Sequence, residues 1–179
     1  MLRVEGKLLI APTPQPIPAL FWVSGFSFSR SQALVEVPYD PHLPQLFFGE
    51  ESSMTARLWT CGWDFYAPGR VVFYHLWSRD HRPSFRENKD VNQAQRRSQQ
   101  RVHYILGRID RVEDEAILIE ISKYGIQSPY KTRELNAFQQ HCGVDFRTGE
   151  ISNLAQLGGV EKQLFLDTIF DLIAQYSNK

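Results

Sequence analysis

The sequence has few cysteines and no long apolar run. Its two cysteines, Cys61 and Cys142, form no C-x-x-C pair. Two isolated cysteines supply neither a zinc site nor a disulfide framework, so both are predicted to be buried, reduced thiols. Every apolar stretch, including the one near the N-terminus, is too short for a signal peptide or a membrane span. These absences predict a protein of a reducing, cytoplasmic setting.

Neither sign of charge is in excess. Twenty basic residues balance twenty acidic ones. A neutral chain has no overall field that attracts nucleic acid or an anionic membrane, so neither is expected as a partner. The sequence also has no internal repeat, and 179 residues suit one domain with a single core.

Aromatic residues are what the sequence has in quantity. They make up 13% of the chain, with 4 Trp, 7 Tyr and 12 Phe. Many of them lie in residues 37–83, where a pair of carboxylates, several arginines and a histidine at the end of a predicted strand stand between them. This mixture favours a pocket that holds a charged phosphate ligand beside a sugar or a peptide.

The pattern of apolar and turn-forming residues predicts a mixed α/β fold with many short strands. Alternate prolines exclude regular structure from residues 11–18. Three segments are predicted as strands: 19–28, bent at Ser24-Gly25, then 64–66 and 70–75. Four are predicted as helices: 50–61, 91–106, 132–141 and 160–176. Residues 33–37 fit a short strand or a helix end, and residues 116–121 fit either a helix or a strand.

Glu50 and Glu51 open the predicted helix 50–61. Carboxylates in a first turn are favoured by the helix dipole, which is reason enough for their presence. The alternative is that one of them faces a pocket and binds an acceptor hydroxyl. Neighbouring side chains on a helix diverge by roughly 100°, so at most one of the two is catalytic and the other is structural. Arg57 is expected to pack rather than to pair with them.

His75 follows V-V-F-Y and is expected where a strand leaves a sheet. A lone histidine in such a place is usually a core or edge residue. Metal ligation needs further ligands, and the sequence has no H-x-H, H-E-x-x-H or D-x-D pattern. Arg79, His81 and Arg82 follow closely and suit either a solvated surface or a clamp on a diphosphate.

Two blocks of this region resemble the polypeptide N-acetylglucosaminyltransferases, the family that modifies hydroxyproline of a cytoplasmic protein. The first block is G-E-E followed by R-L-W-T-x-G-W-D-F-Y-x-P, within residues 49–68. The second lies at residues 73–83 and is similar to the family's F-H-L-W-x-R-x-x-R-P. Residues 123–125 and 143–146 are more loosely similar to its C-terminal region.

The resemblance implies a glycosyltransferase A-type α/β fold. Residues 1–86 would be the C-terminal, acceptor- and metal-side half of the catalytic domain, and residues 87–179 a mainly helical extension packed on it. The implied reaction transfers N-acetylglucosamine from UDP-GlcNAc to a protein hydroxyl, of hydroxyproline or of Ser or Thr, with retention of configuration. Glu50 or Glu51 would orient the acceptor, and His75 would complete a site for a divalent metal, Mn²⁺ or Mg²⁺. The substrate-binding residues would be Trp63, Asp64, Trp77, Arg79 and Arg82.

The family's nucleotide-binding half, with its acidic metal-binding motif, would precede a segment like residues 3–18. This sequence begins close to that point. The alternative function is therefore a fragment or an inactive remnant that binds a peptide or a carbohydrate. We expect residues 1–179 alone to transfer no sugar, aromatic residues of 19–28 to be exposed at an open sheet edge, and residues 79–87 to form a mobile surface loop.

Overall fold

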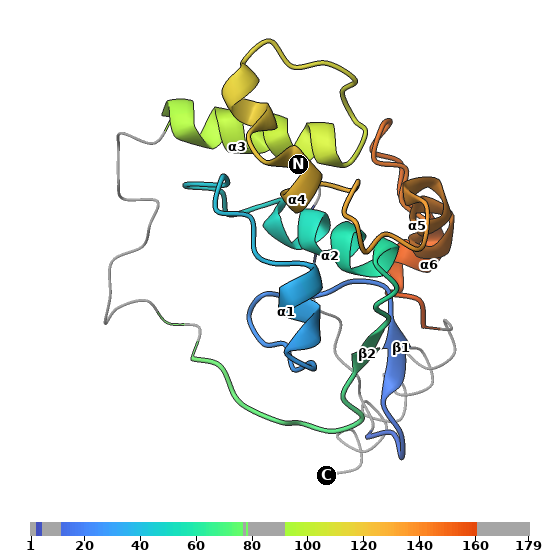
Figure 1. Ribbon diagram of the computed structural model, residues 1–179. Coiled ribbons are helices and arrows are strands. Elements are labelled where there is room, and N and C mark those ends of the chain that lie inside the picture. The colour runs from blue at the N-terminus through green and yellow to red at the C-terminus, as the bar shows by residue number, and fades with distance from the viewer. Residues whose placement is uncertain (1–2, 5–11, 77, 79–91, 161–179) are drawn as a thin grey trace.

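The computed structural model describes residues 3–4, 12–76, 78 and 92–160. Within them, helices gather around one central helix, and a two-stranded sheet lies beside them (Figure 1). The strands are β1 (Ile17–Ala19) and β2 (Phe65–Ala67). The helices are α1 (Gln32–Glu36), α2 (Glu50–Thr60), α3 (Asn92–Ile105), the 3₁₀ helix η2 (Glu115–Leu118), α4 (Ile121–Tyr124), α5 (Leu135–Cys142) and α6 (Asn153–Gln156). This mixed content is compatible with an α/β class.

Helix α2 is the central element, and its prediction is confirmed to within one residue. Gly49 stands before it in the left-handed region at φ 108°, and Gly62 follows it at φ 95°. The two acidic residues of its first turn suit the positive end of the helix dipole. Every residue from position 52 to 60 is buried, because the neighbouring helices and loops enclose α2.

Two apolar clusters pack against different faces of α2. One includes Trp59, whose ring lies 5.5 Å from that of Phe138, and Phe138 in turn stacks on Phe146 at 5.9 Å. The other joins α2 to the segment around α1 and consists of Trp22, Ala33, Val37, Met54, Leu58 and Cys61. Both cysteines are buried and free, as predicted.

The strand predictions are mostly wrong. β1 includes residues 17–18, which were expected to be irregular, and it ends at Ala19 rather than running through 19–28. It pairs antiparallel with β2, with Ile17 opposite Ala67. Residues 70–75 form no strand. Phe26 and Phe28 are exposed, as expected for aromatic residues of 19–28, but Trp22 is buried.

The helix predictions fare better. Helix α3 is confirmed, and Val102, Ile105 and Leu106 at its end are buried. Residues 33–36 belong to helix α1 rather than to a strand, and Val37 is the C-cap of this helix. Residues 116–118 lie in η2, residues 119–120 form a turn, and Ile121 begins α4. Asp114 caps η2 by accepting a hydrogen bond from the Ala116 N–H at 3.0 Å. α5 begins later than predicted, at Leu135. The predicted helix 160–176 and loop 79–87 lie outside the described residues.

The loop 38–44 is held between α2 and α3 by side chains of both helices. Three of its residues are prolines, which have no backbone N–H, so the loop offers mainly acceptors. Arg57 of α2 donates to the Pro38 carbonyl at 2.7 Å, and Ser98 of α3 donates to the Pro44 carbonyl at 2.7 Å. Between them, Arg101 Nε donates to Asp40 Oδ2 at 2.7 Å in a fully buried ion pair.

Replacing Asp40 by Ala should destabilise the fold by about 3–5 kcal/mol, because it leaves the buried Arg101 charge without its partner. Urea unfolding of the variant gives this difference directly. Asp110→Ala is the matched control, since Asp110 makes a similar pair with Arg147 at 2.7 Å but on the exposed surface. An equal loss in both variants would show that burial of the Asp40 pair is not what matters.

Gly69 follows β2 where the chain passes very close to residues 13–15. A Cβ at this position would lie 2.4 Å from the Thr13 carbonyl oxygen, and Thr13 N–H also donates to the Gly69 carbonyl at 2.7 Å. Gly69→Ala should therefore cost about 1–3 kcal/mol in thermal or urea unfolding. Gly25→Ala is the control, because a Cβ there meets nothing within 4 Å. A Gly69→Ala variant as stable as Gly25→Ala would contradict this packing.

Candidate functional site

The two carboxylates at the start of α2 have different environments. Glu51 Oε1 accepts two hydrogen bonds from Ser24, from the backbone N–H at 2.9 Å and from the hydroxyl at 2.8 Å. A carboxylate used in this way ties the turn at residues 24–28 to the first turn of the helix. Glu51 therefore has a structural task.

Glu50 has no such partner. Within the described part of the chain, no hydrogen bond or ion pair reaches its carboxylate, which is partly buried. Burial raises the pKa of Glu50 above its usual 4.5, and the neighbouring Glu51 charge raises it further. A partly buried acid with a raised pKa and no structural partner is a candidate for a functional group. The expectation that at most one of the two is catalytic thus favours Glu50.

The turn that Glu51 holds also contacts the segment that contains His75. The ring of Phe26 lies 4.5 Å from that of Phe73, at an interplanar angle of 36°. His75 is two residues beyond Phe73 and is exposed. The start of α2, the turn 24–28 and the segment 73–75 are thereby linked through two direct contacts. The prediction that His75 ends a strand is wrong, since residues 70–75 pair with no strand in the described part of the chain.

Trp63 and Asp64 lie beyond the other end of α2. This helix of 11 residues is roughly 16 Å long, so they are well separated from Glu50. Trp63 Nε1 donates to Glu36 at 2.9 Å. Asp64 accepts from Arg133 at 2.6 Å, and this hydrogen bond holds the pKa of the Asp64 carboxyl below its usual value.

Arg57 packs inside the protein, as predicted, and does not pair with either glutamate. Its guanidinium donates to the Pro38 carbonyl and lies over the ring of Tyr124 at 5.9 Å. Burial lowers the pKa of Arg57 to about 10, although the nearby Asp40 charge acts in the other direction. Trp77, Arg79 and Arg82, the remaining predicted substrate residues, lie outside the described residues.

The described residues do not by themselves fit a metal ion. No group of three or more His, Cys, Asp or Glu side chains gathers among them. His75 supplies one imidazole, whereas Mn²⁺ or Mg²⁺ prefers a shell made mainly of oxygen ligands.

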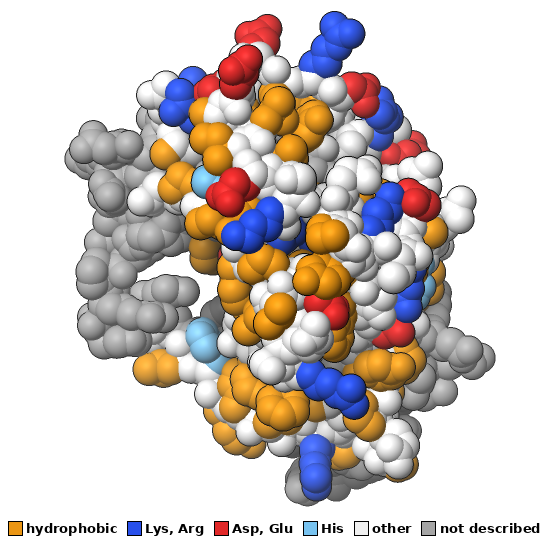
Figure 2. Space-filling model, viewed as in Figure 1, with side chains coloured by type: hydrophobic (Ala, Val, Ile, Leu, Met, Phe, Trp, Pro, Cys, Tyr) orange, Lys and Arg blue, Asp and Glu red, His pale blue; other side chains and the backbone are white. Residues whose placement is uncertain are grey.

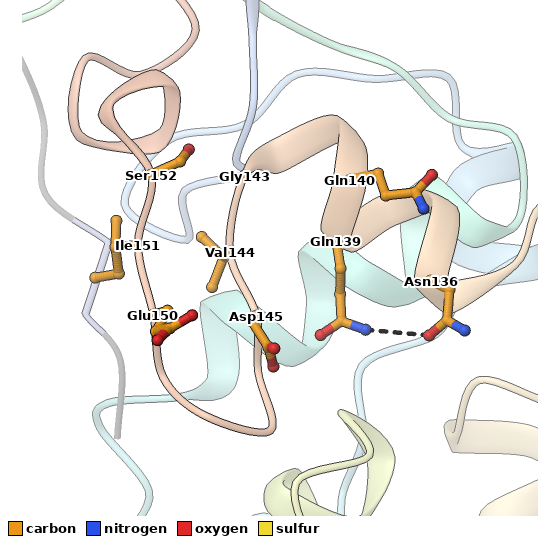
Figure 3. Close-up of a pocket in the computed structure, with 9 residues that line it drawn as sticks. All are labelled: Asn136, Gln139, Gln140, Gly143, Val144, Asp145, Glu150, Ile151 and Ser152. Carbon is orange, nitrogen blue, oxygen red and sulfur yellow. Dashed lines mark hydrogen bonds between the residues drawn. The ribbon is translucent and has the colours of Figure 1, made fainter.

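An open hollow lies between α5 and the turn that follows it, and none of the residues that line it is a predicted site residue (Figure 3). Its polar lining includes Asn136, Gln139, Gln140, Asp145, Glu150 and Ser152. Several of these groups already serve the local fold. Gln139 donates to Asn136 at 3.2 Å and accepts from the Phe146 N–H, and Asp145 accepts from the backbone of the turn. The sequence pointed to this region only through the loose family similarity of residues 143–146.

Comparison with known families supplies the assignment. The model of the family described as Glycosyltransferase (GlcNAc) matches residues 2–148, which is most of the chain. The chain belongs to this glycosyltransferase family. Membership implies a nucleotide-sugar donor and an acceptor in general. No match was found among curated proteins or among solved structures. No helix in the described part of this family member has the length and apolar character needed to cross a membrane.

The raised pKa of Glu50 predicts a specific dependence of stability on pH. The folded state holds the Glu50 proton more tightly than the unfolded chain does, so ionisation disfavours folding as pH rises from 4.5 through the raised pKa. Glu50→Gln removes this effect. Relative to the unmodified protein, the variant should gain stability between about pH 4 and about pH 7. Thermal unfolding at both pH values measures the change, and a relative loss over that range would contradict it.

Proposed function

We propose that the chain forms the acceptor-side part of a glycosyltransferase. The enzyme would transfer N-acetylglucosamine from UDP-GlcNAc to a hydroxyl of a protein, on hydroxyproline or on Ser or Thr, with retention of configuration. The observation that carries this proposal is the contrast at the start of α2. Glu51 is engaged by Ser24, whereas Glu50 has a raised pKa and no partner in the described residues.

In this proposal, Glu50 orients the acceptor hydroxyl by a hydrogen bond. The acceptor oxygen forms a bond to the anomeric carbon while the bond from that carbon to the phosphate oxygen breaks. UDP leaves and its phosphate takes the proton of the hydroxyl. Because the leaving phosphate accepts the proton, Glu50 contributes through orientation rather than as a strong base.

The other predicted residues have supporting roles. Glu51 holds Ser24 and, through the Phe26–Phe73 contact, the segment that leads to His75. His75 is proposed as one ligand of a divalent metal, Mn²⁺ or Mg²⁺. Arg79 and Arg82 are proposed to hold the diphosphate, and Trp77 to bind substrate beside them. Trp63 and Asp64 are at the far end of α2, so they would contact a part of the acceptor remote from the hydroxyl.

Acceptor binding tests the role of Glu50. A hydroxyproline-containing peptide should bind roughly ten- to a hundredfold more tightly than the same peptide with proline, because a hydrogen bond to a charged group contributes about 1.5–3 kcal/mol. Glu50→Gln should reduce this difference, while a peptide-independent property such as the unfolding temperature confirms that the variant is folded. Equal binding of the two peptides to the unmodified chain would contradict the role of Glu50.

Sugar transfer tests the whole reaction. Purified residues 1–179 are incubated with UDP-GlcNAc, Mn²⁺ and the hydroxyproline peptide, and mass spectrometry detects the added sugar. We expect no transfer by this polypeptide alone, because the described residues gather no set of oxygen ligands for a metal-bound diphosphate. Turnover that is lost in His75→Ala would overturn this expectation and make the chain a complete enzyme.

A second candidate function is a binding module without catalysis. It is favoured by two aromatic side chains that are almost fully exposed, Phe28 at 95% and Tyr74 at 93%. Such rings are used to bind carbohydrates and peptides. Binding of the acceptor peptide that is indifferent to its hydroxyl would favour this function. A cytoplasmic setting, which suits two free thiols, is part of both proposals.

A further inference from the structure

Residues 70–76, here called the arm, follow the turn at Gly69 and leave the body of the protein. Figure 1 shows this green stretch running as an uncoiled trace away from the helices. Its sequence, R-V-V-F-Y-H-L, is rich in the β-branched and aromatic residues that favour strands. Yet Val71 is 69% exposed, Tyr74 93% and Leu76 70%. Hydrophobic side chains also reach the surface over much of the face drawn in Figure 2.

The first five residues of the arm have unpaired backbone groups. In the described part of the chain, the N–H and C=O groups of residues 70–74 make no hydrogen bond. The ring of Phe73 rests on Phe26, which fixes one point of the arm against the body. An extended stretch that is apolar and has free backbone donors and acceptors is a template for another strand. A helix laid on the same surface would leave those backbone groups unused.

The arm contains a basic residue and no acidic one. Arg70 opens it, and the sequence from position 65 to 79 contains no Asp or Glu. Arg70 is exposed and makes no ion pair with another described residue. A strand that pairs with the arm is therefore favoured if it carries acidic side chains at its ends, because a cation directly opposite a carboxylate stabilises a strand pair.

We propose that the arm binds an extended segment of a partner polypeptide by β-strand pairing, and that this segment has alternating apolar residues and acidic ends. The contact goes beyond the proposed function and does not depend on it, because it requires neither an acceptor hydroxyl nor a nucleotide sugar. The partner's backbone completes the hydrogen bonds of residues 70–74, and an acidic end pairs with Arg70.

The test uses the full chain and a seven-residue probe peptide of alternating Val and Gln with Glu at both ends. The probe has no hydroxyl, so its binding is separate from acceptor binding. Fluorescence anisotropy should show binding that weakens as salt is added. A probe with an N-methyl group on every backbone amide keeps its side chains but has no N–H to donate at either edge, and it should bind at least tenfold more weakly. A probe with Lys at both ends should also bind more weakly.

Variants of the arm give the matching test from the protein side. Neighbouring N–H groups of a strand point to opposite edges, so Val71→Pro with Val72→Pro removes a donor on whichever edge the probe uses. This double variant should lose at least tenfold in affinity. Val71→Thr with Val72→Thr is the control, which keeps the shape and the donors and should bind within a few-fold of the unmodified chain. Arg70→Glu should reverse the preference between the acidic and the Lys-ended probes.

Three results would overturn the proposal. One is equal binding of the plain and N-methylated probes, which would show a general apolar contact without strand pairing. A second is loss of binding in the Thr control to the same extent as in the Pro variant. The third is that the chain dimerises, that the Pro variant abolishes this dimer and that the probe does not compete with it. The arm would then bind a second copy of the chain.

Discussion

The buried ion pair between Asp40 and Arg101 is the interaction on which the rest of the structure depends. A charge pair out of water is tolerated only where its geometry is good and its remaining groups are bonded. Asp40 meets this condition, since its second oxygen accepts the His42 N–H at 2.9 Å, whereas Arg101 Nη2 has no hydrogen-bond partner among the described residues. The guanidinium of Arg101 also donates to the Ile117 carbonyl, which ties η2 to the same point. One arginine of α3 thus joins a proline-rich loop to a 3₁₀ helix, and Arg57 of α2 completes the attachment of the loop.

The first turn of α2, which follows this loop, is less buried than the rest of the helix. Because α2 is enclosed from residue 52 onward, its first turn is the part that can meet a ligand. Of the two acids there, Glu51 accepts hydrogen bonds from Ser24, whereas Glu50 has no partner among the described residues. The contrast between Glu51, which Ser24 engages, and Glu50, which has no partner in the described residues, is what makes Glu50 our proposed acceptor-binding residue.

The sequence predicted the helices much better than the strands and the site. The residues that predict helix α2 lie within or next to the helix: two acids in its first turn and a glycine after its end. Helix α3 likewise has apolar residues in its last turns that predict a packed face. The segment 70–75 has equally strong local signals for a strand, but a strand also needs a partner, and none is present in the described residues. Trp63 and Asp64 were grouped with Glu50 by their place in a motif. The length of α2 separates these two residues from Glu50. Arg133, which is distant in sequence, donates a hydrogen bond to Asp64. The task of Glu51 depends on Ser24, 27 positions away, which no local pattern encodes.

Glu51, through Ser24, holds the turn 24–28 against the segment that leads to His75. Nuclear Overhauser effects between the ring protons of Phe26 and Phe73 measure this most directly, because the two rings are 4.5 Å apart. We predict that these effects are present in the unmodified chain and in Glu50→Gln but are weakened or lost in Glu51→Ala. Effects that persist unchanged in Glu51→Ala, or that are absent from the unmodified chain, would contradict this role of Glu51.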